Sequence, residues 1–459
     1  MLYGIPPPAA RAPRRGAPFA PLRAAMTAIL REHNGYGPTA AAVVGAWLLV
    51  SGPTLGYAGD PMAVSDRLTG LVAVIFGLLA LSPRRPWAAW AVCAAGFWAL
   101  FAPLLLWTPH PAAYVNSTFA GILLIAMAVV TTRLVDRRAT DQPAIPPGWS
   151  FNPSSFVQRA PIIALAWLSF LMARYMASYQ LGHSDAAWDP VFGDGTEIIL
   201  TSDVSEAFPI SDAGLGAAAY ALEALIGYMG GPARWRTAPW VVALFGLLIV
   251  PVGITSLVLI VLQPLAVGAW CTLCLLAAIA MLAMVVFTLP EVVAMGQFLA
   301  QRRRHGHGFW TSFFRGGTLD DATAEPRPVS LSDPPRQVWR AMTQGVTMPW
   351  SLVTCLALGL WLMLSPLIFL IGDLAADAHF LIGALVITVA AVALAEVAHA
   401  VRLLLIALSL AMLVAAWTLP GADTTAQVST TVVSLALFMF CLPRGPIRET
   451  YGRWQSWVR

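Results

Sequence analysis

Long apolar runs recur along this 459-residue chain, and each is about the length that crosses a bilayer as a helix. Only 11% of the residues are charged, against roughly 25% in soluble domains. Backbone polar groups inside a bilayer must be satisfied internally, which a helix does within one segment. The sequence therefore predicts an all-α polytopic membrane protein with about twelve transmembrane helices, near residues 37–57, 65–82, 87–107, 115–132, 160–181, 213–229, 238–262, 267–289, 350–371, 377–399, 402–419 and 424–443.

Arginine placement orients these predicted spans. If the spans alternate in direction, Arg84, Arg133, Arg234, Arg302 and their neighbours fall on one side of the bilayer, and Arg67 is the exception. The positive-inside rule makes that side cytoplasmic and places both termini there. The net charge of +4 follows from this arrangement and calls for no nucleic acid. The absence of lysine and the abundance of alanine are typical of GC-rich bacterial coding. We therefore expect a protein of the bacterial inner (cytoplasmic) membrane. Its expected surroundings are the lipid bilayer.

Two polar linkers divide the spans into blocks of four. Arg302–Arg304 with Phe309, Trp310, Phe313 and Phe314 predict an interfacial amphipathic segment inside the second linker. The true start of the chain is either Met1 or Met26. The predicted organisation is a disordered cytoplasmic tail (1–36), a four-helix block (37–138), a linker (139–159), a four-helix bundle (160–290), a cytoplasmic linker (291–347), a second outer block (348–443) and a cytoplasmic tail (444–459).

The chain's most specific chemical signal is the pair Cys271 and Cys274, where a span begins at the predicted outer face. Cysteines three apart on a helix share a face, at roughly 5–6 Å between Cβ atoms, which suits a disulfide. A helix N-terminus favours the thiolate that carries out thiol–disulfide exchange. Two packed apolar side chains are the alternative interpretation. Zinc fits less well, because no second pair completes four ligands, and we predict no metal site.

The two outer blocks resemble each other. The run Gly45–Ser51 (GAWLLVS) matches Gly359–Ser365 (GLWLMLS), which Pro366 follows, and Gly96–Pro103 is a looser copy. These motifs resemble the SPW repeat family over roughly residues 37–135 and 348–443. The resemblance implies paired membrane helices and no known chemistry, so we expect scaffolds.

The central block resembles the vitamin K epoxide reductase family, whose membrane dithiol opens the last helix of a four-helix bundle that encloses a quinone. The run Gly268–Leu275 (GAWCTLCL) is the best match. The resemblance implies transfer of two electrons from thiols to a membrane quinone, either ubiquinone or menaquinone. It places Cys274 beside the quinone and lets Cys271 exchange with an extracytoplasmic thiol, for which a thioredoxin-like protein is the expected partner. The helix-entry position likewise predicts that Cys271 is the more accessible sulfur.

Some features depart from that family's pattern. The predicted outer loop, residues 182–212, contains no cysteine, and Thr201 lies where a loop cysteine is expected. Ala278 replaces a tyrosine found in some members. A non-catalytic membrane scaffold with a degenerate bundle is therefore the alternative hypothesis, and a transporter is a weaker third.

Aromatic and charged residues complete the candidates. Trp270, Phe208 and Tyr220 could wall a quinone ring, although an interfacial aromatic belt also explains Trp270. The acidic outer loop, which includes Asp189, predicts a docking surface for a basic partner, a calcium site or a solvated loop. Charged residues within spans predict two ion pairs, Arg174 with Glu223 and Glu396 with Arg402.

Overall fold

The structure is a computed structural model that describes residues 35–132, 144–319, 321–324 and 327–458. The predicted N-terminal tail and the choice between Met1 and Met26 lie outside the described residues, apart from the tail's last two positions.

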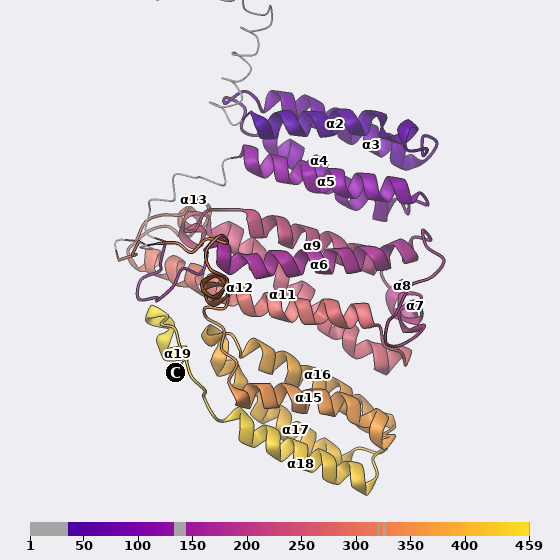
Figure 1. The fold of residues 1–459 in the computed structure, drawn as a ribbon, viewed down its shortest axis with the longest axis vertical. Coiled ribbons are helices and arrows are strands. Elements are labelled where there is room, and N and C mark those ends of the chain that lie inside the picture. The colour runs from indigo at the N-terminus through magenta and orange to yellow at the C-terminus, as the bar shows by residue number, and fades with distance from the viewer. Residues whose placement is uncertain (1–34, 133–143, 320, 325–326, 459) are drawn as a thin grey trace, which may run out of the picture.

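Twelve long helices in the described ranges form three stacked layers (Figure 1). The first layer contains α2 (Tyr36–Thr54), α3 (Pro61–Leu79), α4 (Ala88–Leu105) and α5 (Pro111–Thr131). The middle layer contains α6 (Phe156–Gln180), α9 (Asp212–Tyr228), α11 (Pro239–Leu262) and α12 (Thr272–Arg304). The last contains α15 (Trp350–Phe369), α16 (Asp373–Val392), α17 (Leu404–Thr418) and α18 (Thr424–Cys441).

Short helices occupy the connections between these layers and at the chain's C-terminal end. They are α7 (Gly195–Leu200), α8 (Asp203–Glu206), α10 (Arg234–Thr237), the π-helix η2 (Gln263–Val267), α13 (Phe309–Arg315), α14 (Pro335–Met342), the 3-10 helices η3 (Glu396–Leu403) and η4 (Gly452–Trp454), and α19 (Gln455–Val458).

Ten helices of the described chain are long and apolar enough to cross a membrane by length and composition. Of the remaining long helices, α9 has only 17 residues, and α2 has a glycine, a proline and a threonine in both its first and its last turn. The prediction of an all-α polytopic membrane protein is confirmed.

Glycines bring pairs of helices together in the outer layers. A Cβ added to Gly45 on α2 would lie 2.7 Å from the carbonyl oxygen of Gly70 on α3, and Gly121 on α5 repeats this distance against Gly96 on α4. In the third layer, a Cβ on Gly383 would lie 2.9 Å from the carbonyl oxygen of Gly359. Small residues let helix backbones approach closely in membranes. The glycine of each predicted repeat motif is therefore a helix-crossing point.

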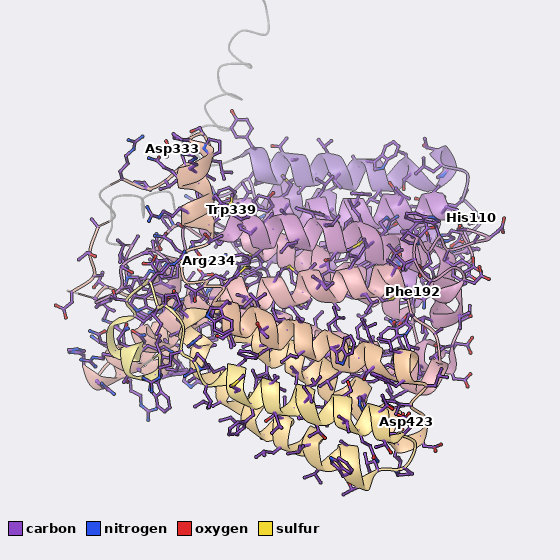
Figure 2. The ribbon with its side chains drawn as sticks, turned by 60° about the horizontal axis from the view of Figure 1, so that its bottom comes forward. His110, Phe192, Arg234, Asp333, Trp339 and Asp423 are labelled. Atoms are coloured by element: carbon purple, nitrogen blue, oxygen red, sulfur yellow. A yellow bond between two sulfur atoms is a disulfide. The ribbon has the colours of Figure 1, made fainter. Side chains whose placement is uncertain are left out.

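The two ends of the helix stack differ in charge. One end, here the acidic end, is formed by the connections 55–60, 106–110, 181–211, 263–271, 370–372 and 419–423, which contain no arginine. The opposite arginine end includes the connections 80–87, 229–238 and 305–349. Figure 2 shows His110, Phe192 and Asp423 at the acidic end, and Arg234, Asp333 and Trp339 at the other.

A buried ion pair at the arginine end fastens α12 to its neighbours. The Arg234 guanidinium lies 2.6 Å from the Glu291 carboxylate, which also accepts a hydrogen bond from Ser154. Glu291 directly follows Pro290, and α12 continues to Arg304. The helix predicted for this span therefore continues past residue 289: the proline lies inside the helix, and the ion pair holds the following turn.

Neither predicted intramembrane ion pair forms. Arg174 faces the first layer, where it donates to the Thr118 hydroxyl at 3.1 Å and lies 4.0 Å from the ring centroid of Tyr114. Glu223 is elsewhere, inside the middle layer. Glu396 accepts hydrogen bonds from the backbone of Arg448 and Glu449 and from the Tyr451 hydroxyl. Arg402 donates to the carbonyl of His399 instead.

Candidate functional site

Cys271 and Cys274 form a disulfide at the start of α12, with their Cα atoms 5.3 Å apart. Cys271 is the N-cap residue, and its Sγ accepts a hydrogen bond from the Cys274 N–H at 3.1 Å. The π-helix η2 and Gly268, whose φ is 73°, reverse the chain just before it. The Gln263 side chain then accepts the Cys271 N–H at 3.1 Å. A short reversal and a side-chain hydrogen bond thus hold the disulfide at the helix entry.

A cover loop, residues 185–200, closes over Cys271 from the acidic end. Its Asp189 carboxylate accepts hydrogen bonds from the Thr272 N–H at 2.9 Å, the Thr196 hydroxyl at 2.7 Å and the Phe192 N–H at 2.8 Å. Burial opposes ionisation of Asp189, but these bonds and one from the Thr272 hydroxyl outweigh it and hold the pKa of Asp189 well below its usual range. Asp189 therefore binds the loop to the first turn of α12 as a carboxylate.

The contact between the cover loop and the disulfide is close. The Thr196 hydroxyl lies 3.5 Å from the Cys271 Sγ, and any Cβ on Gly195 would overlap the Trp270 carbonyl oxygen. Cys271 is 0% exposed as a result. The prediction that Cys271 is the more accessible sulfur is wrong, because a helix entry is open only where no loop folds over it.

Cys274 instead lies in the wall of a cavity of about 250 Å³ inside the middle layer. Phe208 and Tyr220, two of the aromatic residues expected to wall a quinone ring, line the same cavity, and so do Met176, Ser256 and Gln263. The Met176 Sδ contacts the Cys274 Sγ at 3.6 Å. Most of the other lining side chains are apolar. The disulfide therefore presents one sulfur to an apolar chamber and keeps the other behind it.

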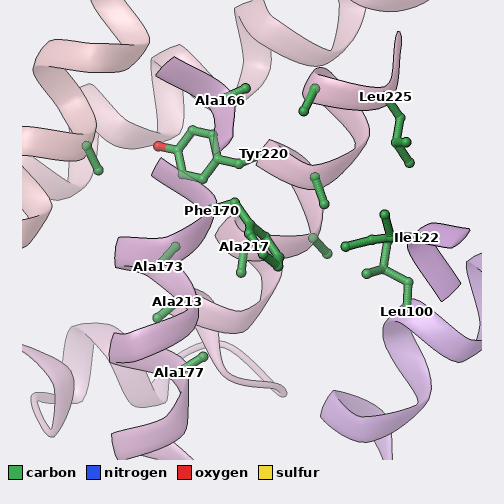
Figure 3. Close-up of a cluster of buried hydrophobic side chains, with 14 of the residues drawn as sticks. Leu100, Ile122, Ala166, Phe170, Ala173, Ala177, Ala213, Ala217, Tyr220 and Leu225 are labelled. Atoms are coloured by element: carbon green, nitrogen blue, oxygen red, sulfur yellow. The ribbon is translucent and has the colours of Figure 1, made fainter. Parts of the chain in front are cut away.

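Alanines set the shape of this chamber where α6 meets α9. Figure 3 shows Ala166, Ala173 and Ala177 of α6 with Ala213 and Ala217 of α9, and the Tyr220 ring beside α6. Because their side chains are short, the two helices lie close together. The cavity lies between α6, α9, α11 and α12, and Ala173 of α6 and Ala213 of α9 are among its lining residues.

The cavity continues into an outer groove between α8 and α11. Val204, Phe208, Thr255, Leu259 and Leu262 line both spaces. The groove also includes Ile254 and Val258, which are exposed on the outer surface of α11. The groove and the cavity therefore adjoin at Phe208, on the side of the domain where α11 exposes apolar side chains.

Two parts of the chain match models of known protein families. Residues 160–289 match the model of the Vitamin K epoxide reductase family. The middle layer is a vitamin K epoxide reductase family domain. Residues 38–131 match the SPW repeat domain. No significant match was found among curated proteins or solved structures.

These matches confirm both resemblances that the sequence motifs suggested. The match to the vitamin K epoxide reductase family supports, at the level of the family, a membrane thiol–quinone oxidoreductase. The SPW match covers the first layer. The likeness of the third layer to that repeat rests on its own motif and on the Gly359–Gly383 crossing, and it stays a prediction.

One predicted aromatic residue lies outside the cavity of the vitamin K epoxide reductase domain. The Trp270 ring packs against Phe380 of α16, at 5.9 Å between centroids, and against Phe192 of the cover loop, at 6.4 Å. It lines a second cavity of about 300 Å³ between this domain and the third layer. Cys274 and Trp270 thus face different spaces.

The loop residue that contacts the dithiol is Thr196 and not Thr201, the position where the sequence suggested a loop cysteine would lie. Thr201 is exposed and donates only to the carbonyl of Glu197, whereas Thr196 touches the Cys271 sulfur. Asp189 serves as the clamp on α12 rather than as part of a metal cluster, and no group of three metal-ligating side chains occurs among the described residues. Gln263 was not predicted as a site residue from the sequence, although it accepts the Cys271 N–H and lines the cavity. A glutamine beside a proline in a long apolar run could have indicated this role.

Proposed function

We propose that the protein accepts two electrons from an extracytoplasmic thiol and passes them through the Cys271–Cys274 pair to a membrane quinone, ubiquinone or menaquinone. The observation that carries this proposal is the position of Cys274 in the wall of an apolar cavity that continues toward the lipid-facing surface. Reduction of the quinone to a quinol takes up two electrons and two protons, which equals what two thiols lose when a disulfide forms.

The cavity's residues fit a quinone head group. Its volume lies just below the roughly 300–1,000 Å³ of sites that enclose drug-sized ligands, so the ring can enter while the isoprenoid tail stays in the outer groove. Phe208 and Tyr220 supply aromatic surface. Tyr220, Ser256 and the Gln263 amide are among the polar groups of the lining that could bind carbonyl oxygens.

The geometry supports different roles for the two cysteines. Cys274 faces the cavity and would exchange electrons with the quinone, whereas Cys271 would form the mixed disulfide with the incoming thiol. Cys271 becomes reachable only when the cover loop leaves α12, because Thr196 and Gly195 lie directly on it. A thioredoxin-like thiol protein would therefore have to displace this loop.

The proposed orientation places the arginine end, with both termini, in the cytoplasm of a bacterium and the acidic end outside its inner membrane. The segment division predicted from the sequence remains part of this proposal. The helix α12 itself continues past residue 290 to Arg304, into the segment predicted as a linker.

Thiol labelling in isolated membranes tests the proposed function. A variant with Cys93, Cys355 and Cys441 replaced by alanine leaves only the reactive pair to label. We expect two labelled thiols after treatment with a dithiol reductant, and none after reductant removal and addition of a quinone. Two persistent thiols in the presence of quinone would refute the electron-transfer role.

The scaffold hypothesis has one structural observation in its favour, the enclosure of Cys271 under a loop that contains no cysteine. If the domain is only a scaffold, the Cys271→Ser, Cys274→Ser double variant keeps the protein's cellular role. Loss of that role, with normal abundance in the membrane, would reject the scaffold hypothesis.

A further inference from the structure

Glu223 is a buried carboxyl group without a partner. Its side chain is 0% exposed, and neither carboxyl oxygen has a hydrogen-bond partner among the described residues. Arg174, its predicted partner, is committed to Thr118 and Tyr114 of the first layer. Buried polar groups nearly always have partners, so an unsatisfied one inside a membrane domain requires an explanation.

A comparison within the same domain shows what a structural carboxyl group looks like here. Glu291 is equally enclosed, but Arg234 binds both of its oxygens at 2.6 Å and Ser154 donates a further hydrogen bond. Glu223 has neither a cation nor a donor. An isolated carboxylate in an apolar interior is costly, so Glu223 is held as the neutral acid and carries a proton.

Glu223 lies beside the cavity that contains Cys274. It is one helical turn from Tyr220, and residues three apart on a helix are neighbours. Tyr220 lines the cavity, and its hydroxyl interacts with Ser256 on α11, which lines the cavity too. Gly216 and Gly227 continue the same inward stripe of α9, the first at the cavity and the second against Ile163.

The charged groups nearest the arginine end are occupied elsewhere. Arg159 of α6 donates to the carbonyls of Gly227 and Met229, and Arg234 and Glu291 bind each other. Two titratable side chains of α9 line the cavity, Asp212 and Tyr220. Asp212 accepts hydrogen bonds from Gln180 and Ser205 at the far end of the helix, so Tyr220 is the one that lies next to Glu223.

We propose that Glu223 is a proton donor for quinone reduction and that it acts through the Tyr220 hydroxyl. This inference rests on the proposed function. As the S–S bond forms, Cys271 and Cys274 lose two electrons and two protons, and the quinone gains two of each. The Glu223 acid gives one proton to Tyr220, whose hydroxyl turns from Ser256 toward it, while Tyr220 gives its own proton to one quinone oxygen. The other quinone oxygen takes the proton of one thiol, and the Glu223 carboxylate takes up the proton that the second thiol released. Protons and electrons balance without another reactant.

Single-turnover quinone reduction by the pre-reduced full chain in lipid nanodiscs tests this inference, with a short-tailed quinone as the probe. We compare the wild type with Glu223→Gln, which keeps the shape but removes the proton, and with Tyr220→Phe. General acid catalysis typically contributes 10²–10⁴-fold, so we expect both variants to slow quinol formation by roughly 10²-fold or more. Glu206→Gln, at an exposed position on α8, is the matched control and should keep the wild-type rate.

Two further readouts separate proton donation from a structural role. A small weak acid such as formic acid should restore part of the Glu223→Gln rate, and quinone affinity should stay unchanged. The infrared spectrum of the wild type should contain a protonated carboxyl band that Glu223→Gln lacks, and this needs no quinone turnover.

The result that overturns the inference is a wild-type rate in Glu223→Gln, a slow rate without acid rescue, or no protonated carboxyl band. An inactive wild type would instead refute the proposed function, while the infrared band still reports on the state of Glu223.

Discussion

The two sulfur atoms of the disulfide have different surroundings, although three positions separate them. Cys271 is enclosed by Thr196, Gly195 and the Asp189 clamp, and Cys274 borders an apolar cavity. This asymmetry supports the proposed assignment of Cys271 to thiols and Cys274 to a quinone. In that proposal, the cover loop is the barrier to electron entry.

A cysteine at position 196 should take the place of the missing loop cysteine. In a Cys274→Ser background, Thr196→Cys places a second sulfur near Cys271, because the Thr196 hydroxyl lies 3.5 Å from the Cys271 Sγ. We expect an intramolecular disulfide under mild oxidation, detected by mass spectrometry of peptides. Thr201→Cys is the matched control and should not cross-link. Cross-linking at 201 but not at 196 would show that the loop lies differently.

Asp189 should make the stability of the cover loop depend on pH. Its pKa is lowered in the folded protein, so its stabilising effect is full above the unfolded pKa of about 4 and is lost as pH falls toward the folded value. We expect Asp189→Ala to cost ~1–2 kcal/mol of unfolding free energy at pH 7, as for a lost helix cap, and expect the gap to shrink below about pH 4.

Thermal unfolding in detergent at several pH values measures this gap. The exposed Asp185→Ala is the control and should behave as the wild type. A gap that stays constant from neutral to acid pH would mean that the Asp189 charge is not what holds the loop.

At the scale of helices, glycine crossings define the outer layers. Gly121 allows α5 to touch α4, where an added Cβ would meet the Gly96 carbonyl oxygen and the Leu100 nitrogen, both at 2.7 Å. These are backbone atoms that cannot rotate away. A methyl group at this position must therefore push the helices apart.

Gly121→Ala should destabilise the protein by ~1–3 kcal/mol, the usual cost of overpacking. Gly296→Ala is the control, because that glycine is inside α12 with no atom within 4 Å, so the alanine should be neutral or stabilise by roughly 0.5–1 kcal/mol. Unfolding temperatures of both variants in the same detergent provide the comparison. Equal destabilisation by both would reject the crossing-point interpretation.

The helices themselves could be predicted from sequence more completely than their contacts. Apolar run lengths predicted the spans, and the dithiol motif predicted the family that the comparison confirmed. The far end of α12 was missed because Pro290 usually ends a helix, and only the Arg234–Glu291 pair shows why it does not. The fates of Arg174 and Glu223 depend on which helix face points inward, which a span prediction leaves open.

At the site too, the sequence could name residues but could not predict the contacts made by distant parts of the chain. Cys274, named from the family resemblance, and Phe208 and Tyr220, named for their aromatic rings, line one cavity. Trp270 points to another cavity, and Cys271 is covered, because the cover loop and the third layer approach this hairpin from positions distant in sequence.

At the scale of the whole molecule, the charge difference between the two ends predicts the orientation in the membrane. Single cysteines at exposed positions of opposite ends, Ala186→Cys and Ser332→Cys, can be probed in the variant that lacks Cys93, Cys355 and Cys441. In intact bacterial cells, a membrane-impermeant maleimide should label position 186 and spare position 332. The reverse pattern would invert the proposed topology and place the dithiol toward the cytosol.

The most direct measurement counts quinol molecules formed by the purified, reduced chain in nanodiscs when a short-tailed quinone is added under anaerobic conditions. If the dithiol beside the cavity is the electron donor, absorbance should report close to one quinol per protein, the disulfide should return, and Cys274→Ser should form none. Quinol formation that does not depend on Cys274, or a dithiol that stays reduced beside excess quinone, would contradict it.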